Sequence, residues 1–176
     1  MPAAVPIAPQ ALLDHALQLA THQSGAGRPR AIWLRRAVSA AYYASFHALS
    51  LAIVRQLAPN STPDDQYRLC RSLDHARVAD VCAWVRGQPG TGKQQVQSIV
   101  TNLQGSSDIK QLALIISTLQ EQRHRADYDH LASFDKASTL GYVSQGQRAI
   151  NLLTVVPETP DGELFLALVA LHTQLR

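Results

Sequence analysis

The chain has 176 residues, 46% of them hydrophobic, and a mean hydropathy near zero, which is ordinary for a globular protein. Its length fits one domain with a proper core, or one domain with an appendage. The net charge of +3 is compatible with a phosphate-bearing partner but does not demand one. The two cysteines favour neither a disulfide framework nor a zinc site, and the first ten residues lack a signal-peptide pattern. We therefore expect a cytoplasmic protein.

Two helix signals open the chain. Residues 9–23 carry apolar side chains at helical spacing behind a proline, and the SGAG sequence at 24–27 ends this first helix. Residues 28–57 have no glycine and a proline only near the start, which predicts one long helix of about eight turns. Around this helix lie a large apolar stripe, a stripe of alanines that lets another helix come close, and a polar stripe. The polar stripe consists of Arg36, Ser39, Tyr43, His47 and Ser50.

The long helix carries no charge from Ala37 to Val54, a length close to that of a membrane span. Its serines and His47 would be costly in lipid, and its alanines add little hydrophobicity. We therefore expect the central, largely buried helix of a bundle, with no membrane association.

The patterns that follow are also helical. Thr62 is placed to cap a helix that runs to about Val85, either unbroken or interrupted near Asp74 and His75. The segment 87–93, GQPGTGK, resembles a phosphate-binding loop, but Gln94 stands where Ser or Thr should hold magnesium and no strand precedes it, so we interpret it as a turn. Further helices are predicted over residues 94–103, 108–130, 136–155 and 160–175.

The chain contains no segment whose apolar residues alternate with a period of two. We therefore predict an all-α fold, an antiparallel bundle of about six or seven helices. Residues 1–156 should form the bundle, and residues 157–176 a C-terminal helix packed on it or extending it. The predicted core includes Tyr42, Phe46, Leu49 and Ile116.

Charged residues continue an apolar stripe near the end of the helix predicted over 108–130. Unpaired buried charge is expensive, so these groups need a network or a substrate. On a regular helix Arg123 and His130 lie within about 20° of each other, whereas Arg125 and His130 diverge by about 140°. We therefore favour Arg123, Asp127 and His130 as one set, with Arg125 on the opposite side. Asp127 can hold the Arg123 guanidinium or orient His130.

Two segments carry a resemblance to a known family. Residues 41–46, AYYASF, and 123–128, RHRADY, are similar to the A-Y-Y-A-x-F and R-x-x-A-D-Y segments of the HEPN domain family. The similarity covers about residues 8–155 and implies a HEPN-like helical bundle. The family's catalytic signature is Arg, four to six residues, then His. Both Arg123 and Arg125 fit this signature with His130.

The resemblance implies two alternative functions. Members with the signature are typically metal-independent endoribonucleases, often toxins or defence proteins, with a site built from both copies at a dimer interface. Others are non-catalytic modules that bind nucleotides or accompany nucleotidyltransferases. The implied partners are therefore a second copy of the chain, RNA, and an antitoxin or a nucleotidyltransferase. Ala40 stands where many relatives have Arg, and no Asn follows Arg123 or Arg125, which keeps the non-catalytic alternative open.

Cleaving RNA without metal requires a base for the 2′-OH, an acid for the leaving oxygen and positive charge for the phosphorane. In the nuclease hypothesis, His130 transfers protons, Arg123 supplies the donor fork and Asp127 holds the geometry. The expected substrate-binding residues are Arg36, Tyr43, His47, Arg125 and Tyr128. We expect no cofactor and no metal, because no carboxylate or His/Cys cluster has metal-ligand spacing. The structural alternative is a network in which Arg123 pairs with Asp127.

Overall fold

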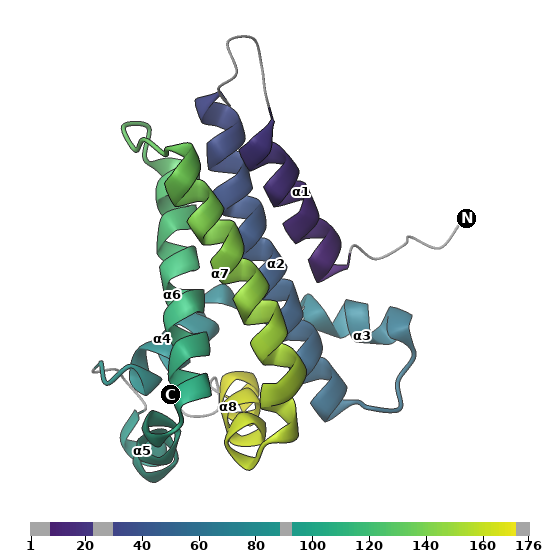
Figure 1. Ribbon diagram of the computed structural model, residues 1–176. Helices are drawn as coiled ribbons and strands as arrows, with labels where there is room; N and C mark the ends of the chain where they lie inside the picture. The colour runs from purple at the N-terminus through teal and green to yellow at the C-terminus, as the bar shows by residue number, and fades with distance from the viewer. Residues whose placement is uncertain (1–7, 23–29, 89–92, 172–176) are drawn as a thin grey trace.

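The computed structural model describes residues 8–22, 30–88 and 93–171, and within these ranges the regular structure is entirely helical (Figure 1). The α-helices are α1 (Pro9–Thr21), α2 (Ala31–Leu57), α3 (Pro63–Cys70), α4 (His75–Val85), α5 (Gln97–Gly105), α6 (Ser107–Tyr128), α7 (Lys136–Val155) and α8 (Pro160–Leu171), with 3-10 turns at Lys93–Val96 and Val156–Glu158. The all-α prediction is confirmed. The described part has eight α-helices rather than six or seven, because the segment after Thr62 forms two.

Helix α2 runs through the middle of the bundle, and α1, α6 and α7 all pack against it (Figure 1). Its predicted alanine stripe makes this possible: Ala37, Ala41 and Ala44 are fully buried. From α7, Gly146 adds to the close fit, since a Cβ there would lie 2.8 Å from Cδ1 of Leu13 and 3.3 Å from the Ala41 carbonyl oxygen. The small residues of α2 and α7 therefore let the backbones of these two helices approach closely.

The main core lies between α2 and the helices that follow it. Tyr42, Leu49 and Ile116 are at most 1% exposed and Phe46 is 5% exposed, so this part of the predicted core is confirmed. Helix α8 contributes to the same apolar cluster through Phe165, Leu166, Leu168 and Val169. The C-terminal helix thus shares the core of the bundle.

Helix α2 is long and apolar enough to cross a membrane by length and composition, and 78% of its most apolar window is buried inside the bundle. The neighbouring helices cover most of the apolar surface of α2, so this surface is removed from water within the protein itself. One helix of this kind is weak evidence for membrane insertion.

The predicted helix boundaries depend on short polar side chains. The Thr62 hydroxyl accepts a hydrogen bond from the Asp65 N–H at 3.3 Å, and Asp74 caps α4 by accepting from the Ala76 N–H at 2.8 Å. Asp135 caps α7 in the same way, accepting from the Ser138 N–H at 2.8 Å. The predicted turn at 24–27 lies outside the described residues, as does most of the turn predicted at 87–93.

Candidate functional site

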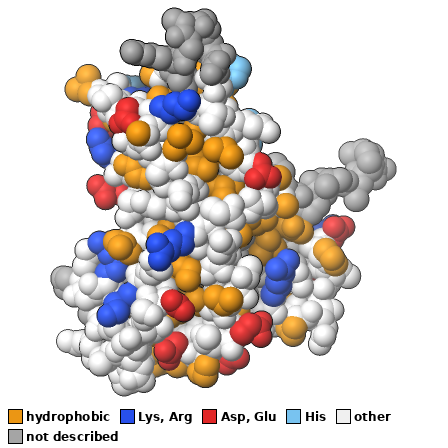
Figure 2. Space-filling model, viewed as in Figure 1, with side chains coloured by type: hydrophobic (Ala, Val, Ile, Leu, Met, Phe, Trp, Pro, Cys, Tyr) orange, Lys and Arg blue, Asp and Glu red, His pale blue; other side chains and the backbone are white. Residues whose placement is uncertain are grey.

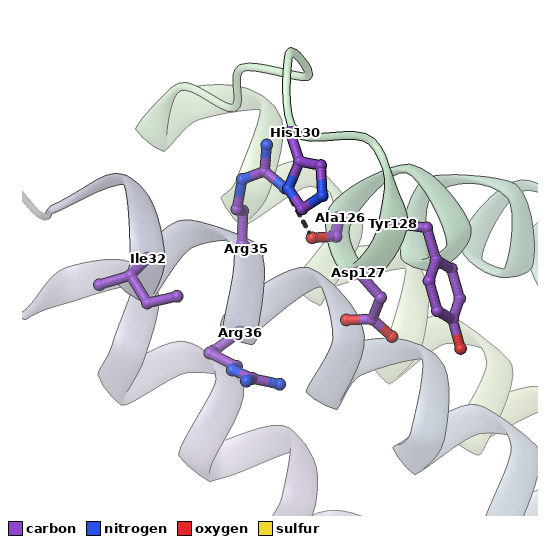
Figure 3. Close-up of a pocket in the computed structure, with 7 residues that line it drawn as sticks. All are labelled: Ile32, Arg35, Arg36, Ala126, Asp127, Tyr128 and His130. Carbon is purple, nitrogen blue, oxygen red and sulfur yellow. Dashed lines mark hydrogen bonds between the residues drawn. The ribbon is translucent and has the colours of Figure 1, made fainter.

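A pocket of about 470 Å³ opens between the start of α2 and the end of α6 (Figure 3). Its lining residues are Ile32, Arg35, Arg36, Ala126, Asp127, Tyr128 and His130. Asp127 and His130 belong to the catalytic set expected from the sequence, and Arg36 and Tyr128 to the expected substrate-binding set. Residues about 90 positions apart in the chain therefore meet in one cavity.

Helix α6 ends at Tyr128, two residues before His130. The prediction that this helix continues through His130 is wrong, and with it the calculation that places Arg123 and His130 on one helical face. The physical reason is local: the Asp129 carboxylate accepts hydrogen bonds from the N–H groups of Leu131 and Ala132, at 2.9 and 3.2 Å, and turns the chain out of the helix. His130 is exposed and reaches the pocket from this turn (Figure 3).

Arg35 holds the end of α6 in place. Its guanidinium donates hydrogen bonds to the carbonyl oxygens of Ala126 at 2.8 Å, Asp129 at 2.7 Å and Ala132 at 2.7 Å. The last carbonyls of a helix have no partner within the helix and carry the negative end of its dipole, so a cation is favourable there. Arg35 therefore shapes the pocket by fixing the turn that carries His130. No local pattern in the sequence around Arg35 predicted this role.

Arg123 and Asp127 form an ion pair one helical turn apart, with 2.8 Å between Nε and Oδ2. Both residues are tied to α2: the Ser39 hydroxyl donates to Asp127 Oδ1 at 2.6 Å, and Arg123 Nη2 donates to the Tyr43 hydroxyl at 2.5 Å. The two side chains are 23% and 19% exposed, so water screens the pair only partly. The result is a polar clamp between α2 and α6, made of Ser39, Tyr43, Arg123 and Asp127.

The guanidinium of Arg123 is largely committed to this clamp. Its central carbon lies 5.3 Å from the ring centroid of Tyr43 and 5.5 Å from that of Tyr128, which places the cation between two aromatic rings. Burial acts to lower the pKa of Arg123, but the hydrogen bond to Tyr43 and the negative charge of Asp127 outweigh it and raise that pKa. Arg123 thus contacts the pocket residues Asp127 and Tyr128 but is not itself part of the lining.

An aromatic cluster lies beside the clamp. The Tyr42 hydroxyl is 2.6 Å from Nδ1 of His75, and the His75 ring stacks on Phe46 with 3.8 Å between centroids. Burial lowers the pKa of His75, and the positive charge of Arg123 lowers it further. Burial likewise raises the pKa of the Tyr42 hydroxyl. These directions favour a neutral Tyr42–His75 pair that connects α4 to α2.

The two remaining expected substrate residues lie elsewhere. Arg125 is exposed, donates to Gln122 Oε1 at 3.0 Å and lies 6.0 Å from the Phe134 ring centroid. His47 is an exposed residue whose ring lies edge-on to Phe46. The part of the ring that is covered by neighbouring residues lowers the pKa of His47. Neither side chain contributes to the pocket lining.

No model of a known family, no curated protein and no solved structure matches this chain. In the part of the chain that the structure describes, no three His, Cys, Asp or Glu side chains are grouped as metal ligands would be. The pocket and the clamp are therefore the features of the described structure that bear on function.

Proposed function

We propose that the protein is a non-catalytic, HEPN-like module that binds the phosphate groups of RNA in the pocket between α2 and α6. The observation that carries this proposal is that an exposed arginine, Arg36, and an exposed histidine, His130, line one cavity. A volume of about 470 Å³ lies in the range of small-molecule sites and is large enough for a nucleotide.

Arg36 is one of the cations that line this pocket. Among the described residues it makes neither an ion pair nor a side-chain hydrogen bond. The nearby carboxylate of Asp127 is already paired with Arg123, so the charge of Arg36 is left for a ligand. An arginine fork can bind two oxygens of one phosphate, and His130 adds a second donor from the opposite wall.

Electrostatic attraction by the surface outside the pocket should add little to the affinity for RNA. Figure 2 shows acidic and basic side chains interspersed across one face of the bundle, with apolar side chains between them. The net charge is only +3. Affinity for phosphate should therefore come from the pocket, with a shallow salt dependence.

The commitment of Arg123 to the clamp supports a non-catalytic role. Its charge is offset by Asp127, and the same carboxylate accepts from Ser39. Among the described residues that line the pocket, His130 is then the single histidine, whereas RNA cleavage needs both a base and an acid.

The test is binding of a labelled single-stranded RNA, measured by fluorescence anisotropy in EDTA. Arg36→Ala should weaken binding about tenfold or more, the loss of one bidentate phosphate contact. Arg55→Ala is the matched control, because Arg55 is an exposed arginine of the last turn of the same helix and should leave binding unchanged. Absence of RNA binding at about 100 μM protein, or equal effects of the two substitutions, would overturn the proposal.

A second candidate is a metal-independent endoribonuclease, favoured by the presence of Asp127 and His130 beside Arg36 in one pocket. The missing proton-transfer group and the charge for the phosphorane would come from a second copy of the chain, as a composite site requires. In this case wild-type protein cleaves RNA in EDTA, and His130→Ala reduces the rate on the order of 10²–10⁴-fold. Intact RNA together with a monomer by light scattering would reject the nuclease.

The remaining proposals concern location and protein partners. Cys70 and Cys82 are free and buried, which fits the reducing cytoplasm. An antitoxin or a nucleotidyltransferase remains the proposed protein partner, and it would be detected by co-purification with the product of a neighbouring gene.

A further inference from the structure

Tyr128 is the exposed aromatic residue of the pocket rim. It is the last residue of α6, and the residue is 60% exposed although its ring is large and apolar. Figure 3 shows it on the side of Asp127 away from His130. An exposed ring beside a bound phosphate is the arrangement that single-strand-binding proteins use to hold a base.

The Tyr128 ring is held by its neighbours. The Arg123 guanidinium carbon lies 5.5 Å from its centroid, and the His124 ring lies 5.0 Å away at an interplanar angle of 47°. Arg123 is in turn fixed by Asp127 and by the Tyr43 hydroxyl. The ring therefore loses little further freedom on binding, which favours its use as a platform.

We infer that Tyr128 stacks on the base of an unpaired nucleotide whose phosphate is bound by Arg36 and His130, so that the ligand is single-stranded RNA rather than a duplex. This inference rests on the proposed function and adds the recognition of the base to it. The carboxylate of Asp127 is paired with Arg123 and offers no donor to a phosphate, so Arg36 and His130 are the lining side chains that bind it. The base then falls toward the Tyr128 side of the pocket.

The strandedness of the ligand follows from the geometry of stacking. In a duplex both faces of each internal base are covered by neighbouring base pairs, so no base face is available to Tyr128. In a single strand a base can swing out and stack on an aromatic ring, and any base can do so because each has a π face. The site should therefore discriminate weakly among bases and strongly against paired RNA.

The experiment compares three ligands on wild-type protein: a short single-stranded RNA, its duplex, and a strand of the same length with abasic sites. Wild type should bind the single strand more tightly than either of the other two. Tyr128→Ala should weaken single-strand binding on the order of 5- to 100-fold and leave abasic binding unchanged, since only the stacked base is lost. Tyr128→Phe keeps the ring and should bind as wild type does.

The outcomes separate this inference from the proposed function. If Arg36→Ala weakens binding but abasic and base-bearing strands bind wild type equally, the stacking role is overturned and the phosphate site stands. If no strand binds wild type, both fail. The comparison of the three ligands uses wild-type protein alone, so it tests the stacking role even if Tyr128→Ala unfolds. Thermal melts of Tyr128→Ala and Tyr128→Phe show whether either variant has unfolded.

Discussion

Removing the guanidinium of Arg123 tests the clamp between α2 and α6. Arg123→Ala deletes the ion pair to Asp127 and the hydrogen bond to the Tyr43 hydroxyl. Of the side-chain partners of Asp127 in the described structure, the Ser39 hydroxyl then remains, in a site where the carboxylate side chain is 19% exposed. We expect the free energy of unfolding to fall, because a carboxylate that is largely shielded from water loses its counterion.

The size of the effect lies between two limits. Fully exposed ion pairs contribute about 0–1 kcal/mol, and breaking a fully buried pair costs about 3–5 kcal/mol. With Arg123 and Asp127 23% and 19% exposed, the loss should be about 2 kcal/mol. At about 2–4 °C per kcal/mol for a chain of this length, the melting temperature should fall by roughly 4–8 °C.

The assay is urea unfolding of wild type, Arg123→Ala, Asp127→Asn and the double variant, followed by circular dichroism. The two single effects should be less than additive, with a coupling of about 1 kcal/mol for residues in contact. Arg125→Ala is the control, because Arg125 is an exposed arginine two residues along α6 and should change stability by no more than about 0.5 kcal/mol. Zero coupling, or an Arg125→Ala effect as large as that of Arg123→Ala, would refute the clamp.

Three further predictions concern packing, the end of α6 and pH. Gly146→Ala should destabilise by about 1–3 kcal/mol, because its Cβ would lie 3.3 Å from the Ala41 backbone carbonyl oxygen and would displace the buried Leu13 Cδ1 at 2.8 Å. Gly141→Ala enters open space and should stabilise by about 0.5–1 kcal/mol, and equal effects of the two substitutions in thermal melts would contradict this. Arg35→Ala removes the guanidinium donor from three carbonyl oxygens, so amide hydrogen exchange of residues 129–132 should accelerate, and unchanged rates would argue against its capping role. Burial lowers the pKa of His75 in the folded chain, so the unfolded chain binds the proton first as the pH falls. The free energy of unfolding should therefore stay constant above a pH of about 6.5 and decrease below it. A decrease that is just as large in His75→Gln would count against this.

Local signals in the sequence predicted most of the helices. The bounds of α7, Lys136–Val155, agree with the prediction, because Asp135 supplies a local cap and the apolar residues keep a helical period. The core face of α2 was equally predictable from its spacing of large side chains. Such features depend on residues within one or two turns of each other.

The end of α6 depends on a side chain that competes with the helix for backbone N–H groups, and the pocket depends on contacts between residues far apart in the chain. The helical period of the sequence predicted that α6 continues to His130. The Asp129 carboxylate instead accepts hydrogen bonds from the N–H groups of Leu131 and Ala132, and the helix ends at Tyr128. The partners of Arg35 lie 91 to 97 residues further along the chain, and no pattern around Arg35 indicates them. The pairing of Arg123 with Asp127 was predictable from i, i+4 spacing, whereas the anchoring of both side chains on Ser39 and Tyr43 required the fold.

The central claim is that a phosphate of single-stranded RNA binds beside His130, and the imidazole signals of the histidines test it most directly. We would record long-range ¹H–¹⁵N spectra while adding a short single-stranded RNA, with the His130 signal assigned by its loss in His130→Gln. Binding in the pocket should shift the His130 signal and leave that of His75 in place, and Arg36→Ala should suppress the shift. RNA that binds while the His130 signal stays unchanged would contradict the claim.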